Sequence, residues 1–376
     1  MSMPEAPLDR LRAQCWSSTG DLLYFNSAAH GLLPDCARIA VEQYLTDLQH
    51  GASEQEFSPA VERLRTNLAQ WVGCADADLA FCQNVSAGLN IILRGFAWEP
   101  GRHILLCPEI EHPTLIWAAR ALDPLGVKVR TVPAPRGQVL AEDVVAAMSD
   151  ETQMVALSAV SYLSGGRIDL AKVGAACRQR HVFFLVDAAQ SVGFARINMK
   201  EQFIDGLVAN VHKGLLGLAG LGFLGVNRQW LPHIRPLVVG QESVDSRQEP
   251  WQWADSARRF EVGHRNSVAA VATLASLELL GSVGIDAIER HIVNLRHYLV
   301  NCLMAENLRV LAPDADSHIV AIEPHQGSAA ELVQALSARG VKAAARGQYV
   351  RFSLHAYNVY DDVDRLLDIV RRDNLR

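Results

Sequence analysis

Short apolar runs that alternate with helical patterns constrain the fold of this chain more than any other feature. The residues between the runs carry apolar positions at helical spacing, notably over 86–96, 113–124, 140–149 and 169–180. Apolar strands that alternate with helices are typical of a mostly parallel sheet covered on both faces. The sequence therefore predicts an α/β fold with a seven-stranded sheet, whose strands are expected at 79–82, 103–107, 128–132, 153–158, 182–187, 206–211 and 221–226.

The pattern changes after about residue 235. A polar stretch over 240–258 is interpreted as a long loop, and loops of this length are often functional. The residues beyond it predict a small α+β unit. We therefore expect a large domain over 20–240 and a small domain over 241–376 that also takes in 1–19. The elements expected after the loop are helices at 267–281, 284–305, 328–339 and 359–373 and strands at 317–322, 341–345 and 349–354.

The composition indicates which kinds of binding partner and which cellular compartment to expect. A net charge of −6 over 376 residues argues against nucleic acid and anionic membranes as main partners. No apolar run is long enough to span a bilayer, and the first residues lack the pattern of a secretory signal. The seven cysteines are scattered, with no metal-binding spacing. We therefore expect a cytoplasmic protein with no bound metal.

Two residues at the ends of neighbouring predicted strands indicate a cofactor. Asp187 ends the run 182–187, and Lys213 follows the run 206–211. A lysine amine can bond covalently to the aldehyde of pyridoxal phosphate, and a carboxylate can keep the pyridine nitrogen protonated. Taken singly, each residue has a simpler interpretation. A lysine after a strand is usually a solvated surface charge, and an aspartate at a strand end usually caps a helix or forms a turn. Their joint placement favours a pyridoxal phosphate site.

Further polar residues fall where such a site needs them. Ser86 and Ala87 open a predicted helix, whose N-terminus suits a phosphate, although Ser86 alone could be a simple cap. His112 follows the run 103–107 and could lie over the pyridine ring, or be a surface loop residue. The remaining candidates for the cofactor are Gln190 for its phenolic oxygen and Asn210 and His212 for its phosphate.

Arg351 is the main candidate for binding a substrate carboxylate. It lies within an apolar predicted strand, where a guanidinium is costly to bury unless an anion pairs with it. A planar guanidinium binds a carboxylate through two parallel hydrogen bonds. The alternative is an ion pair with a nearby acid such as Asp361. Arg265 and Arg346 are weaker candidates for the same role.

The motifs together resemble the class V, cysteine desulfurase-like branch of fold-type I pyridoxal phosphate enzymes. They occur in that family's order over nearly the whole chain. The resemblance implies a homodimer with two sites at the subunit interface, a covalent cofactor link at Lys213, Asp187 at the pyridine nitrogen, His112 over the ring and Arg351 on the substrate carboxylate. The motifs are 24–29 (YFNSAA), 84–88 (NVSAG), 111–113 (EHP), 186–190 (VDAAQ), 212–214 (HKG) and 351–358.

Departures from the family pattern refine the expected activity. Segments 84–93, 111–113 and 259–262 are most similar to cysteine or cystine C–S lyases. Desulfurases carry a mobile-loop cysteine shortly before the carboxylate-binding arginine, and 341–351 contains none. Tyr162 stands where desulfurases often have asparagine, and His264 stands where the family often has a threonine that reaches the partner's phosphate. We expect Asn26 and Tyr162 to contact substrate and His264 to contact cofactor.

The sequence thus predicts a pyridoxal phosphate enzyme that acts on an L-amino acid. The favoured activity is a C–S β-lyase on a cysteine derivative, without a protein-bound persulfide. A class V aminotransferase or an amino-acid epimerase would share every step through removal of the α-proton. A catalytically silent protein that binds the cofactor as a sensor is the alternative from another class. A cofactor bound with no turnover of any amino acid would favour that last alternative.

Overall fold

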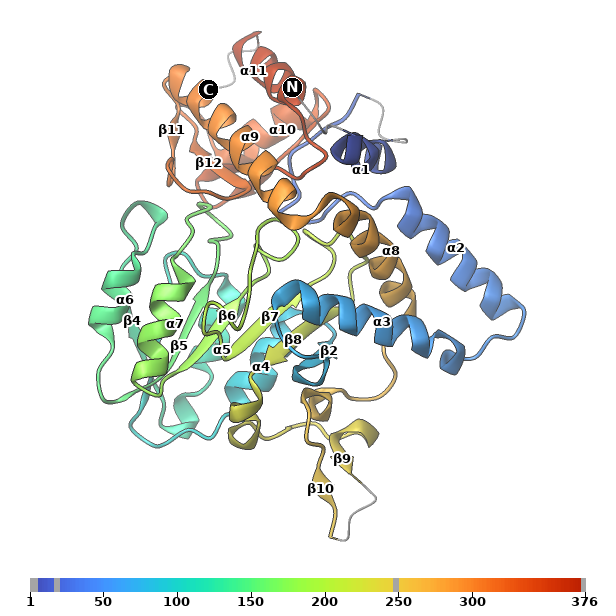
Figure 1. The fold of residues 1–376 in the computed structure, drawn as a ribbon. Coiled ribbons are helices and arrows are strands. Elements are labelled where there is room, and N and C mark those ends of the chain that lie inside the picture. The colour runs from blue at the N-terminus through green and yellow to red at the C-terminus, as the bar shows by residue number, and fades with distance from the viewer. Residues whose placement is uncertain (1–5, 17–20, 246–249, 373–376) are drawn as a thin grey trace.

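A seven-stranded, mostly parallel sheet forms the centre of the molecule (Figure 1). The computed structural model describes residues 6–16, 21–245 and 250–372. The strand order is β2-β8-β7-β6-β5-β3-β4, and only β8 runs against its neighbours. The predicted α/β fold with seven strands is confirmed. The strands are β2 (Leu79–Cys82), β3 (His103–Leu106), β4 (Lys128–Thr131), β5 (Thr152–Ser158), β6 (Phe183–Asp187), β7 (Gly206–Asn210) and β8 (Gly222–Val226).

The central strands are continuous apolar runs because both faces of the sheet are buried. In β6, Phe184 and Val186 belong to one hydrophobic cluster, whereas Phe183 and Leu185 belong to the cluster on the other face. Successive side chains of a strand point to opposite faces, so each face needs its own apolar set. The helices that follow these strands are α4 (Val85–Gly95), α5 (Pro113–Arg120), α6 (Ala141–Ala147) and α7 (Leu170–Gln179). The helix predicted over 113–124 is too long, because α5 ends at Arg120 and a 3-10 turn covers Asp123–Leu125.

A second sheet lies beyond one end of the first (Figure 1). It is antiparallel, in the order β11-β12-β15-β14, and an N-terminal strand, β1 (Leu23–Tyr24), pairs in parallel with β13 (Val341–Lys342) beside it. The single strand predicted over 341–345 is wrong, because this segment forms two short strands, β13 and β14, which pair with different neighbours. The division into two domains stays a prediction. The other strands and helices are β11 (Arg309–Val310), β12 (Ile319–Glu323), β14 (Ala344–Arg346), β15 (Tyr349–Ser353), α9 (Ile285–Ala305), α10 (Ala329–Ser337) and α11 (Tyr360–Arg372).

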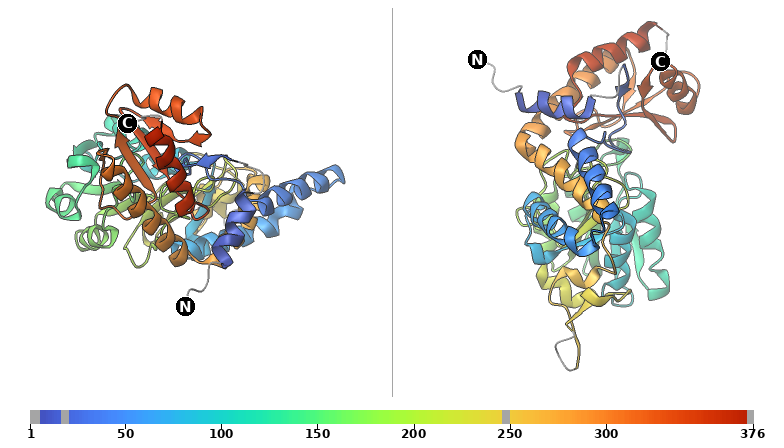
Figure 2. Two further views of the ribbon diagram at one scale, coloured as in Figure 1. Left: turned by 90° about the horizontal axis from the view of Figure 1, so that it is seen from above. Right: turned by 90° about the vertical axis from the view of Figure 1, so that its right-hand side faces the viewer.

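Helices from both halves of the chain pack beside the main sheet. α8 (Ser267–Val283) contacts α2 (Asp35–Gln49) and α3 (Glu54–Val72), and the far end of α2 projects beyond the sheet (Figure 2, left). α1 (Ala6–Trp16) lies near α8. Among the described residues, no single helix has both the length and the apolar character to cross a bilayer, although α8 and α9, bent by 78°, meet that criterion as a pair.

The stretch predicted as a loop over 240–258 is only partly irregular. β9 (Val244–Asp245) and β10 (Gln252–Trp253) form an antiparallel hairpin that projects from the body at the end opposite the C-terminal sheet (Figure 1). Trp251 and Trp253 contact each other edge to face, with ring centroids 5.1 Å apart. Residues 246–249, between the two strands, lie outside the described ranges.

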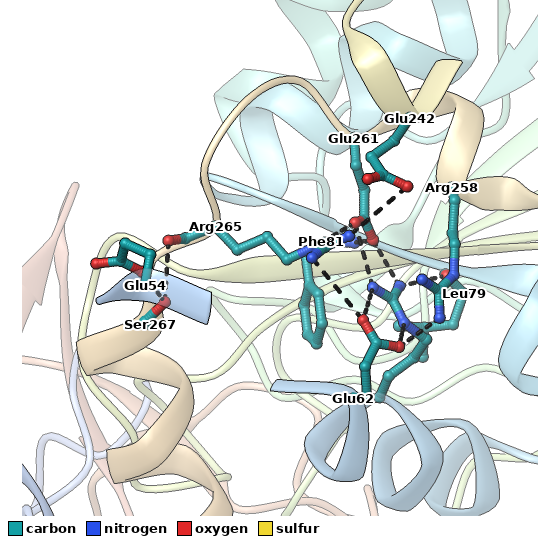
Figure 3. Close-up of polar contacts among 10 residues, drawn as sticks. Glu54, Glu62, Leu79, Phe81, Glu242, Arg258, Glu261, Arg265 and Ser267 are labelled. Atoms are coloured by element: carbon teal, nitrogen blue, oxygen red, sulfur yellow. Dashed lines mark hydrogen bonds and ion pairs between the residues drawn. The ribbon is translucent and has the colours of Figure 1, made fainter. Parts of the chain in front are cut away.

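An ion-pair network ties the segment after this hairpin to the body (Figure 3). Glu261 accepts from Arg65 of α3 at 2.5 Å and from the Phe81 amide of β2 at 2.9 Å, and all but 2% of the Glu261 side chain is buried. Arg265 donates to the same carboxylate at 2.7 Å, and Glu62 pairs with Arg65 at 3.0 Å. The network holds Glu261 and Arg265, the residues on either side of the segment that carries His264.

Candidate active site

Lys213 lies in a tight turn that follows β7. The Gly31 amide donates to the carbonyl of His212 at 2.8 Å, so the N-terminal segment packs directly against this turn. A Cβ at Gly31 would overlap the carbonyl oxygen of Lys213, which explains a glycine there. The turn is therefore held by backbone contacts on both sides, and its lysine side chain is half-buried.

A cavity of about 180 Å³ lies at the carboxyl ends of β5, β6 and β7, and Lys213 lines it. Ligands of open α/β sheets bind at this edge of the sheet. We call this cavity the Lys213 pocket. It brings together eight of the residues predicted from sequence, and its lining consists of Asn84, Val85, Ser86, His112, Thr114, Ser158, Val160, Tyr162, Asp187, Ala189, Gln190, Asn210, His212 and Lys213.

The two residues that first indicated a cofactor are electrostatically coupled. Burial raises the pKa of Asp187, while the Ala189 amide, which donates to it at 2.9 Å, and the charge of Lys213 oppose that rise. Burial lowers the pKa of Lys213 to about 8, with Arg351 and Arg346 adding to the fall and Asp187 opposing it. An amine with this pKa is available as a nucleophile or base near neutral pH.

His112 is the N-cap of α5, and its ring faces the pocket. Its Nδ1 accepts from the Thr114 amide at 3.3 Å, and its ring lies edge to face with Tyr162, at 5.0 Å between centroids. Burial, and then the positive charge of Lys213, lowers the pKa of the imidazole. Both effects favour the neutral form of His112.

Gln190 is held from two sides at the pocket wall. Its Nε2 donates to the Ala28 carbonyl at 3.0 Å, and its Oε1 lies 3.2 Å from Nε2 of His318. The imidazole of His318 stacks on Phe194, with ring centroids 3.6 Å apart. One N–H of the Gln190 amide is left for a ligand, as its predicted contact with a phenolic oxygen requires.

Arg351 is buried on β15 and lacks an acidic partner within the described ranges. Its Nη1 donates to the carbonyl of Tyr162 at 2.6 Å, while Nε and Nη2 have no hydrogen-bond partner. The alternative ion pair with Asp361 is absent from the described part of the chain, so that interpretation is wrong. Burial, and then the charge of Arg346, lowers the pKa of the guanidinium to about 9. A carboxylate would satisfy both the charge and the two free donors.

Other buried polar atoms around Lys213 also lack partners among the described residues. They are Oδ1 of Asn210 and Nδ1 of His212, which line the Lys213 pocket, and Oδ1 of Asn26, which lies outside its lining beside Ser353. Buried polar atoms in proteins almost always have a partner, so a cluster without one indicates a polar ligand. Pyridoxal phosphate offers groups that fit the pocket: its pyridinium N–H could donate to Asp187, and its phosphate could accept from the ring nitrogen of His212 or the side-chain NH2 of Asn210.

Two predicted cofactor residues lie elsewhere in this chain. Ala87 and His264 line a second cavity of about 820 Å³, to which Asn84 also contributes. The N-cap of α4 is Asn84, whose Oδ1 accepts from the Ala87 amide at 2.9 Å. Ser86 is thus not the cap, and the Ala87 N–H is already engaged. Contacts of Ala87 and His264 with the cofactor stay predictions.

The sequence interpretation missed a buried carboxyl group beside Asp187. Glu111 accepts from the amide of Ser158 at 2.8 Å, and the Ser158 hydroxyl also donates to it. Ser158 is the β-ladder partner of Asp187. Burial raises the pKa of Glu111 to about 8, opposed by these hydrogen bonds, and Asp187 adds to the rise. The signal available from sequence was an acid placed directly before His112.

Thr114 was also missed, although it lines the Lys213 pocket and bonds to His112. A threonine in the first turn of a helix carries no distinctive signal, because the residue type is common there.

The chain is similar in sequence and in fold to proteins of known family. The chain is 28% identical over 282 residues to a probable cysteine desulfurase of Methanothermobacter thermautotrophicus, covering 72% of this chain and 70% of that protein. It resembles a solved complex of the cystine C–S lyase C-DES with cysteine persulfide, at 26% identity, a TM-score of 0.88, and coverage of 94% of this chain and 98% of that one.

A cysteine desulfurase from Thermococcus onnurineus shares the fold, with a TM-score of 0.90 at 21% identity over 99% of this chain and 98% of that one. The family described as "Aminotransferase class-V" matches residues 23–366. That match covers the Lys213 pocket together with Arg351. The chain therefore belongs to the class-V aminotransferase family and is a pyridoxal phosphate-dependent enzyme.

Proposed function

We propose that this enzyme is a C–S β-lyase that acts on an L-cysteine derivative and does not form a protein-bound persulfide. The observation that carries the proposal is the absence of a cysteine from the described lining of the Lys213 pocket. Persulfide transfer needs a thiolate that can reach the substrate sulfur. Burial raises the pKa of Cys82 and Cys107 to about 12, and Cys302 lies in α9.

Three residues of this chain would have separate roles in such a reaction. Arg351 binds the substrate carboxylate through its two free donors. The cofactor, when bound, supplies an electron sink for the charge left at the α-carbon. Lys213, with its lowered pKa, takes the α-proton, and Asp187 holds the proton of the pyridine nitrogen. The products are pyruvate, ammonia and the sulfur leaving group.

We also propose a homodimer with active sites at the subunit interface. His264 and the exposed residues Leu237, Val238 and Val262 line the second cavity, and exposed apolar side chains that gather in this way often mark a protein interface. In the dimer, His264 would reach the cofactor phosphate of the partner subunit. Asn84, which lines both cavities, marks where the two sites adjoin.

The test is a product assay on cofactor-loaded enzyme supplied with cystine or an S-conjugate of cysteine. Pyruvate is expected without any added 2-oxo acid, and Lys213→Ala is expected to produce none. Intact-mass measurement after turnover should show no added sulfur on the protein. Amino transfer that depends on an added 2-oxo acid, a change of chirality without pyruvate, or sulfur retained on a cysteine would each refute the lyase proposal. Cofactor binding with no turnover would identify a silent sensor.

A further inference from the structure

Thr114 lines the Lys213 pocket but has no part in the chemistry above. It is the second residue of α5, two residues after His112. Both its backbone amide and its hydroxyl lie within hydrogen-bond distance of Nδ1 of His112, at 3.3 Å and 3.0 Å. Two contacts from one residue to one ring nitrogen control which nitrogen carries the proton.

The backbone contact decides the direction of both bonds. An amide N–H can only donate, so Nδ1 of His112 must present its lone pair to Thr114. In a neutral imidazole the proton then resides on Nε2. The Thr114 hydroxyl can reinforce this arrangement by donating to the same lone pair.

A second hydroxyl supports that direction. Ser86, at the start of α4, donates to Oγ1 of Thr114 at 3.4 Å. Because Oγ1 accepts from Ser86, its own proton is free to point toward Nδ1 of His112. Two consecutive hydrogen bonds therefore point in the same direction: Ser86 donates to Thr114, and Thr114 donates to His112.

The ring is also fixed in orientation and charge. Tyr162 packs edge to face against it, and Nε2 has no hydrogen-bond partner among the described residues. Three cations, Lys213, Arg346 and Arg351, act on the imidazole and disfavour a second proton. Nε2–H is thus the donor that a ligand in the pocket would meet.

We propose that Thr114 is a positioning residue that holds His112 as the neutral Nε2–H tautomer, so that His112 donates a hydrogen bond to the leaving sulfur and does not act as a base. The hydrogen bond from His112 to sulfur rests on the proposed lyase function, whereas the tautomer of His112 does not depend on that function. Lys213 takes the α-proton, the electron pair of the Cα–H bond forms the Cα–Cβ double bond, and the C–S pair departs with sulfur. A neutral imidazole is a suitable donor because developing thiolate charge needs stabilisation rather than full protonation.

Nitrogen NMR of protein labelled with ¹⁵N-histidine reads the tautomer directly, with or without cofactor. The His112 signals are assigned by their loss in His112→Gln. Wild-type protein near neutral pH is expected to carry the proton on Nε2 and none on Nδ1. A proton on Nδ1, an equal mixture of tautomers or an imidazolium would overturn the proposal.

Two variants connect the tautomer with catalysis. Thr114→Val removes the hydroxyl donor but keeps the side-chain shape and the backbone amide donor, so a part of the population should shift to the Nδ1–H tautomer and kcat should fall by up to about tenfold, with KM nearly unchanged. Thr114→Ser should restore both. Equal tautomers and rates in the Val and Ser variants would refute the positioning role. Should Thr114→Val fail to fold, Thr114→Ala, which also lacks the hydroxyl, takes its place in the comparison with Thr114→Ser. An Nε2–H tautomer in protein that releases no pyruvate would refute the lyase and retain the positioning role.

Discussion

Arg65 and Glu261, 196 residues apart in sequence, form an ion pair that is almost wholly buried. Both terminal nitrogens of the Arg65 guanidinium donate to the Glu261 carboxylate, Nη1 at 2.5 Å and Nη2 at 3.2 Å. The pair joins α3 to the segment that carries His264. Without Glu261, Arg65 would stay buried with only the partly exposed Glu62 as an acidic partner, and losing a buried partner is far more costly than losing a surface ion pair.

Glu261→Gln is therefore expected to lower the free energy of unfolding by about 3 kcal/mol. The matched control is Glu278→Gln, which breaks the exposed pair with Arg63 and should cost under about 1 kcal/mol. Urea unfolding of the two variants measures both values. Similar losses in the two variants would contradict the importance of burial.

Glu111 should make stability fall as pH rises through the neutral range. Its native pKa of about 8 lies above the ordinary value of 4.5, so between these values the folded state holds a proton that the unfolded state has lost. The contribution is fully present at low pH and is lost as pH approaches 8. Glu111→Gln removes it, so the stability difference between wild type and variant should change by up to about 1.4 kcal/mol per pH unit. Parallel stability curves from pH 5 to 8 would disprove the raised pKa.

Arg351→Lys should impair substrate binding more than cofactor binding. An ammonium group cannot reproduce two parallel hydrogen bonds to a carboxylate, so kcat/KM should fall about 100-fold, mainly through KM. Arg346→Lys, at a less buried arginine, should reduce it less than about tenfold. Cofactor absorbance of both variants should match that of wild type. A loss confined to kcat would place Arg351 outside carboxylate recognition.

A complementation experiment tests whether His264 acts on the partner's site. His264→Ala should weaken cofactor binding, whereas His325→Ala, on the exposed surface of the C-terminal unit, should not. Mixing inactive Lys213→Ala with impaired His264→Ala should form heterodimers in which one of the two sites is intact. Activity should recover to about a quarter of wild type, because half of the dimers are mixed. No recovery in dimers shown to have exchanged subunits would place His264 and Lys213 in the same protomer's site.

The sequence predicted the main sheet and the core of the Lys213 pocket because both depend on local patterns. Asp187 and Lys213 directly follow buried strands, and parallel strands carry such residues to one edge of the sheet. α1 and α2 were missed because their apolar patterns are weak; α2 buries only Ala37 and Tyr44 fully. The separation of β13 from β14 depends on the pairing of β13 with β1, which is distant in sequence and cannot be predicted from a local pattern.

Contacts made through tertiary packing were beyond sequence reasoning. Gln190 meets His318 across 128 residues of chain, and Glu111 meets Ser158 across 47. Ser86 was interpreted as a possible cap, but Asn84 is an equally good capping residue and lies at the actual helix start. Choosing between them requires knowing where β2 ends.

The pairing of β1 with β13 has a consequence for how the protein is made. Strands β2 to β8, and with them every residue that lines the Lys213 pocket, lie before residue 227 in the sequence. Phe25 and Asn26 must wait for residues 342–353 before their partners exist. A chain that ends before β15 would therefore keep the residues that line the Lys213 pocket but lack Arg351, the proposed carboxylate-binding group, together with the strand that holds Asn26 in place.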